Sequence, residues 1–114
     1  MRLAATLVLL STTAAAAAAA ETHPCAHDAI AKARPLLELH HGMKLEELGG
    51  IVDKVKVLPP IKALKGNGKL DVLEVWGYIY KGEYRMRFIY IQGTKPGEPC
   101  GLMGQEILET SNPY

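Results

Sequence analysis

The fold is decided by one stretch of the chain, residues 70–92, which reads LDVLEVWGYIYKGEYRMRFIYIQ. The stretch is dense in β-branched and aromatic residues, the types that favour strands. Only Lys81-Gly82 interrupts it, and such a pair suits the tight turn of a hairpin. We therefore predict two antiparallel strands joined at Lys81-Gly82.

A two-residue turn at this point would sort the side chains of the hairpin into two faces. The first face carries no charge and is expected to belong to the core. Its members are Leu73, Val75, Gly77, Ile79, Tyr84, Met86, Phe88 and Tyr90. The second face is expected to look toward water, and its cross-strand pairs are Tyr80 with Glu83, Tyr78 with Arg85, and Trp76 with Arg87.

The aromatic and arginine residues of the second face form a candidate partner-binding surface. They are Trp76, Tyr78, Tyr80, Arg85 and Arg87. Trp, Tyr and Arg dominate the energetics of protein interfaces, so a binding role is one interpretation. The simpler alternative is that these cross-strand pairs only stabilise the sheet.

The segments on either side of the hairpin complete an α+β pattern. Apolar residues recur at helical spacing from Cys25 to about His41, where Gly42 is placed to end the helix. Pro35 would either kink this helix or open a second one. Residues 51–57 then alternate as a strand does, and Pro59-Pro60 favours an edge position or a break in it.

Leu102 to Glu109 reads as the last strand of an antiparallel meander. The predicted fold is thus an N-terminal helix packed on one face of three to four strands. We find no internal repeat and no sign of a second domain.

The N-terminal residues have the layout of a secretory signal peptide. Arg2 is followed by an apolar stretch and an alanine run that ends at Ala20. We expect a signal peptide over residues 1–20, cleavage before Glu21, and a mature domain over residues 21–114 in the periplasm or outside the cell. A membrane anchor is the alternative, but the alanine-rich stretch is only weakly hydrophobic, which argues against it. Because cleavage would remove this stretch, we expect no membrane insertion of the mature domain.

Cys25 and Cys100 are the two cysteines of the chain. In an oxidising compartment an isolated pair is most simply a disulfide, and a small domain benefits from one. We therefore predict a Cys25–Cys100 bond that joins the start of the helix to the start of the last strand.

Composition argues against several classes of function. Without Arg2 the chain has 12 basic and 12 acidic residues, so no long-range field would gather nucleic acid. The sequence has no glycine-rich phosphate loop, no Cys-X-X-Cys pair and no nucleophile motif, so we expect no enzyme activity and no cofactor.

Four histidines leave one alternative open, a periplasmic metal-binding protein. The candidate ligands are His23, His27, His40 and His41. A soft site near His23 and His27 would need Cys25 as a free thiolate, which a disulfide would remove. His27 and His40 are also on the order of 20 Å apart along a helix.

An alanine-rich helix ended by a glycine, followed by an aromatic hairpin, resembles the PepSY family of small exported bacterial domains. The matching residues are Ala29, Ile30, Ala33 and Gly42, then the hairpin 75–91 with Tyr84 in its second strand. The resemblance implies a regulatory or inhibitory module that binds a protein or peptide partner. The acidic-glycine turn common near that family's last strand is replaced here by Met103-Gly104-Gln105.

Overall fold

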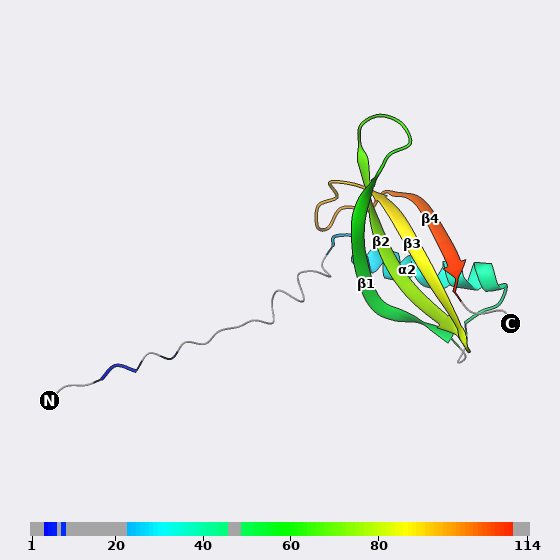
Figure 1. The fold of residues 1–114 in the computed structure, drawn as a ribbon, viewed down its shortest axis with the longest axis horizontal. Coiled ribbons are helices and arrows are strands. Elements are labelled where there is room, and N and C mark those ends of the chain that lie inside the picture. The colour runs from blue at the N-terminus through cyan, green and yellow to red at the C-terminus, as the bar shows by residue number, and fades with distance from the viewer. Residues whose placement is uncertain (1–3, 7, 9–22, 46–48, 111–114) are drawn as a thin grey trace.

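The computed structural model describes residues 4–6, 8, 23–45 and 49–110. One helix packs on one face of a four-stranded antiparallel sheet, which confirms the predicted α+β class (Figure 1). The elements are α2 (Ala26–His41), β1 (Gly49–Lys62), β2 (Lys69–Ile79), β3 (Gly82–Ile91) and β4 (Leu102–Glu109). The predicted signal peptide lies almost entirely outside the described residues, as does its expected cleavage site. No helix among the described residues is long and apolar enough to cross a membrane.

Helix α2 is continuous through Pro35, so the alternative of two short helices is wrong. Pro35 lies on the exposed side, where its ring does not enter the core. The helix ends as predicted at Gly42, which has the positive φ of 85° that glycine adopts most readily. The Gly42 N–H donates to the Glu38 carbonyl at 2.8 Å and thereby caps the last turn.

Strand β1 is an edge strand, as Pro59-Pro60 led us to expect, because the sheet order is β1-β2-β3-β4. It does not end at the prolines but runs on to Lys62. Its pairing with β2 shifts between Ile51 and Val55 and again between Leu58 and Ile61. Such irregularities bend and twist a strand, and β1 is visibly curved in Figure 1.

The hairpin turn differs from the prediction. Ile79 pairs with Gly82, so the two turn residues are Tyr80 and Lys81, and Tyr80 has a φ of 54°. Trp76 consequently lies opposite Arg85 rather than Arg87, and Tyr78 lies opposite Glu83. The shift is by two positions, and a strand repeats every two residues, so both predicted faces keep their members except Tyr80, which now lies in the turn.

The core lies between α2 and the uncharged face of the hairpin, as predicted. Fully buried members are Ala29, Ala33, Leu37, Leu73, Val75, Met86, Phe88 and Tyr90. Gly77 allows the helix to approach β2, because a Cβ there would lie 2.8 Å from Leu37 Cδ2 and 3.0 Å from Met86 Cε. A larger side chain at this position would therefore require the ends of the Leu37 and Met86 side chains to move.

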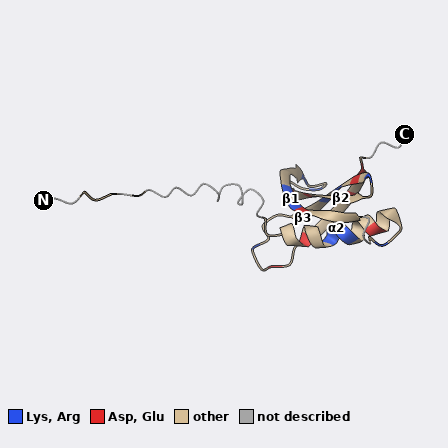
Figure 2. Ribbon diagram, turned by 90° about the horizontal axis from the view of Figure 1, so that it is seen from below, with Lys and Arg blue, Asp and Glu red and all other residues tan. Residues whose placement is uncertain are grey.

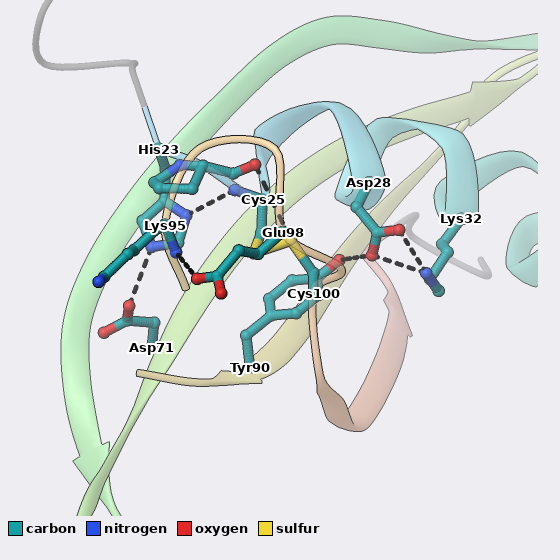
Figure 3. The surroundings of a disulfide bond; sticks show 10 residues. His23, Cys25, Asp28, Lys32, Asp71, Tyr90, Lys95, Glu98 and Cys100 are labelled. Carbon is teal, nitrogen blue, oxygen red and sulfur yellow. Dashed lines mark hydrogen bonds and ion pairs between the residues drawn. A yellow bond between two sulfur atoms is a disulfide. The ribbon is translucent and has the colours of Figure 1, made fainter. Parts of the chain in front are cut away.

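The disulfide joins Cys25 to Cys100, as predicted, and no cysteine is free among the described residues. Beside it the buried Tyr90 hydroxyl donates to Asp28 Oδ2 at 2.7 Å (Figure 3). Burial would raise the pKa of Asp28, but the hydrogen bonds from Lys32 and Tyr90 outweigh it and lower this pKa. Burial and the Asp28 carboxylate raise the pKa of Tyr90. The phenol thus stays protonated and links the sheet to the first turn of α2.

Candidate partner-binding surface

Among the described residues no helix covers the sheet face turned away from α2, and we call this face the outer face (Figure 2). Four of the five predicted surface residues lie on it: Trp76, Tyr78, Arg85 and Arg87. Tyr80 does not, because it occupies the turn, where it is 72% exposed and its ring lies 5.5 Å from Lys81 Nζ. The predicted surface residues therefore share one face, apart from Tyr80 in the turn.

A groove of about 880 Å³ runs along the outer part of β1 and β2. Its lining is mainly apolar, with charged residues of both signs among the aliphatic and aromatic ones. The lining residues are Val52, Lys54, Val55, Lys56, Val57, Glu74, Trp76, Gly77, Tyr78 and Glu83. Concave, largely apolar sites with a few polar groups are the usual form of binding pockets.

Glu74 is a part of this surface that the sequence pattern did not reveal. It belongs to the outer face, yet it is only 5% exposed. Its two carboxylate oxygens accept hydrogen bonds from Trp76 Nε1 and from Arg87 Nε, each at 2.9 Å. The carboxylate thus fixes the indole ring at the edge of the groove.

The pKa of Glu74 is lowered. Burial alone would raise this pKa, but the hydrogen bonds from Trp76 and Arg87, with the positive charges of Arg87 and Arg85, lower it below its ordinary value of 4.5. A lowered pKa stabilises the fold above the pKa of the unfolded chain, and that contribution disappears as the pH falls through the folded-state pKa.

Replacing Glu74 by glutamine is expected to lower the free energy of unfolding at pH 7 by about 1–3 kcal/mol, because it removes charge-assisted hydrogen bonds. The difference from the unchanged protein should shrink as the pH falls below the ordinary carboxyl value of 4.5 and on through the lowered folded-state pKa of Glu74. Urea unfolding between pH 7 and pH 3 measures both quantities. Glu106→Gln, at an exposed position of β4 in the same cross-strand row, is the control and should cost much less. A Glu74→Gln deficit that is constant across this pH range would contradict the assigned role.

The histidines are not brought together. His23 lies beside the disulfide, where its Nε2 is 2.9 Å from Asp71 Oδ2 and its Nδ1 accepts the Cys25 N–H (Figure 3). His40 contacts the ring of Tyr84 edge-on, with ring centroids 5.8 Å apart. The remaining two, His27 and His41, occupy exposed positions of α2.

This arrangement leaves the metal hypothesis without support in the described part of the chain. Both ring nitrogens of His23 are engaged, and the sulfur of Cys25 is in the disulfide, so the soft site imagined from the sequence cannot form. Among the described residues no three His, Cys, Asp or Glu side chains gather as a metal site would require.

Comparison of the chain with protein-family models, with curated proteins and with solved structures gives no match. The class that fold and surface define is a disulfide-closed α+β domain whose outer face carries an aromatic groove.

Proposed function

We propose that this protein is a non-enzymatic, exported module that binds a protein or peptide partner through the groove beside Trp76 and Tyr78. One observation carries the proposal: aromatic side chains border a mainly apolar groove on the face opposite the core, and Tyr78 is 46% exposed there. Burial in the core cannot account for aromatics at these positions. The disulfide is compatible with an oxidising compartment.

The groove suits an extended peptide segment with apolar anchors and charges of both signs. Trp76 is held by its hydrogen bond to Glu74, so less rotamer entropy would be lost when a partner packs on the indole. Lys54 and Lys56 line the β1 side, while Glu74 and Glu83 lie on the other strands. The PepSY resemblance, which rests on the sequence alone, agrees with a regulatory or inhibitory role for such binding.

The proposal is tested by comparing what three immobilised forms of the protein retain from periplasmic extract. The forms are the unchanged protein, Trp76→Ala and Leu64→Ala. The last is the control, because Leu64 is a fully exposed loop residue outside the groove. A specific partner should bind the unchanged protein and the control. Trp76→Ala should weaken its binding by about 2 kcal/mol or more, roughly 30-fold in Kd.

Titration with the purified partner gives the Kd and a direct report from the site. Trp76 is the single tryptophan of the chain, so its fluorescence should change on binding. Tyr78→Ala provides a second variant that keeps this signal. A partner whose Kd is the same for Trp76→Ala, Tyr78→Ala and the unchanged protein would refute the proposed surface.

A further inference from the structure

The two edges of the sheet differ in how they are protected from pairing with another strand. β1 carries Pro59 and Pro60, lysines and two register shifts, all of which discourage a further strand. β4 has no proline and no lysine, and its one register shift lies at its start, beside Tyr90. Within the described residues no strand pairs with its outer side.

The backbone of β4 presents hydrogen-bonding groups on that outer side. The Thr110 N–H donates to the Glu83 carbonyl at 2.8 Å, which marks residues 83 and 110 as a hydrogen-bonded pair. Bonded and non-bonded pairs alternate along an antiparallel ladder. The N–H and C=O groups of Gln105, Ile107 and Glu109 therefore point away from β3, toward the open edge.

A shallow apolar groove of about 220 Å³ lies between this edge strand and α2. It is lined by Lys32, Pro35, Leu36, Leu39, Leu102 and Gln105. Leu39 is 78% exposed, which is unusual for a leucine on a helix that packs on a sheet. Side chains of an added strand that lie opposite Gln105 and Ile107 would share the α2 side of the sheet and fill this groove.

The charges on the outer face of the sheet set a second requirement on a strand added beside β4. A cross-strand row on the outer face alternates in sign across the whole sheet: Lys56, Glu74, Arg87 and Glu106. An added strand would extend the row, and a basic residue opposite Glu106 would continue the alternation. A second copy of this chain would instead bring the Glu106 and Glu109 carboxylates of both copies to one interface.

We propose that the open edge of β4, together with the groove between β4 and α2, binds an extended peptide segment of a partner by β-strand addition. The segment carries apolar side chains at alternate positions and a basic residue opposite Glu106. Main-chain hydrogen bonds to residues 105, 107 and 109 supply affinity, and the groove supplies specificity. This site is separate from the groove beside Trp76 and does not depend on it.

The test uses synthetic eight-residue peptides. In the first, valine and threonine alternate and one arginine lies between the two central valines; in the second, glutamate replaces that arginine. The third peptide is a scramble in which the valines are contiguous. The first should bind best, and hydrogen exchange should show new protection at the amides of Gln105, Ile107 and Glu109.

Three variants separate the contributions. Gln105→Pro removes an outward N–H without taking a bond from the β3 ladder, and Leu39→Glu places a charge in the groove without touching the backbone. Each should weaken binding of the first peptide about 10-fold or more. Glu106→Lys should reverse the preference between arginine and glutamate peptides, whereas Leu64→Ala, in an exposed loop outside both grooves, should leave the affinity unchanged.

Several results would overturn the proposal. These are equal binding of the scramble, protection at β1 in place of β4, unchanged affinity in Leu39→Glu and Glu106→Lys, or no binding at millimolar peptide. A dimer that Leu39→Glu dissociates would make a second copy the occupant and refute a peptide partner. The affinity of Gln105→Pro is interpreted only if its unfolding curve shows a folded protein. If this variant is unfolded, Leu39→Glu and Glu106→Lys decide the test.

Discussion

Replacing Cys100 by alanine is expected to lower the free energy of unfolding by roughly 2–5 kcal/mol. The disulfide closes a loop with a sequence separation of 75 residues, which greatly restricts the unfolded chain. Native proteins have total stabilities of about 5–15 kcal/mol, so this loss would be a large fraction of the whole. Urea denaturation followed by circular dichroism measures the loss.

Reduction provides the matched control. A thiol reductant should destabilise the unchanged protein toward the level of Cys100→Ala and should leave the variant itself unaffected. If the unchanged protein unfolds at the same urea concentration with and without reductant, the disulfide does not contribute as expected.

Phe88→Ala should lower the free energy of unfolding by about 3–5 kcal/mol, the range typical of deleting a buried aromatic side chain. Phe88 is completely buried on the sheet face that meets α2. Trp76→Ala removes a larger side chain, but from the outer face, where the residue is only partly buried. Its cost should stay below about 2 kcal/mol, chiefly because the Glu74 carboxylate loses one donor.

Measured side by side, the two variants distinguish the core face of the sheet from the outer face. Trp76→Phe separates the parts of the tryptophan contribution, because it keeps an aromatic ring and loses the indole N–H. A larger destabilisation from Trp76→Ala than from Phe88→Ala would place Trp76 in the core and would contradict the observed register.

The sequence could predict the strand β4, but not its open edge or the groove beside it. The strand Leu102–Glu109 was predicted with the boundaries that the structure has, because the glycines and prolines of the loop before it are a local signal. That its outer side is open, and that α2 forms a groove beside it, depends on elements more than sixty residues apart in the chain. No local pattern contains that information.

The hairpin also combines a feature that the local sequence predicts correctly with one that it does not. Glycine at the second position made Lys81-Gly82 the natural turn, yet the chain turns at Tyr80-Lys81 with Tyr80 at positive φ. The whole ladder with β1 and β4, and the packing on α2, set this register. Because the error was two positions, the faces survived it while each cross-strand pair was wrong.

The sequence by itself determined the α+β class, the helix and its glycine cap, the two faces of the hairpin and the pairing of Cys25 with Cys100. Each follows from the spacing of apolar residues along a short stretch, from a local glycine, or from the presence of just two cysteines in the chain. Only the tertiary structure decided the burial of Glu74, whose partner Arg87 lies on the neighbouring strand, and the pairing of His23 with Asp71. Burial and hydrogen bonding depend on which distant residues fold against a side chain, and periodicity along the chain does not encode that.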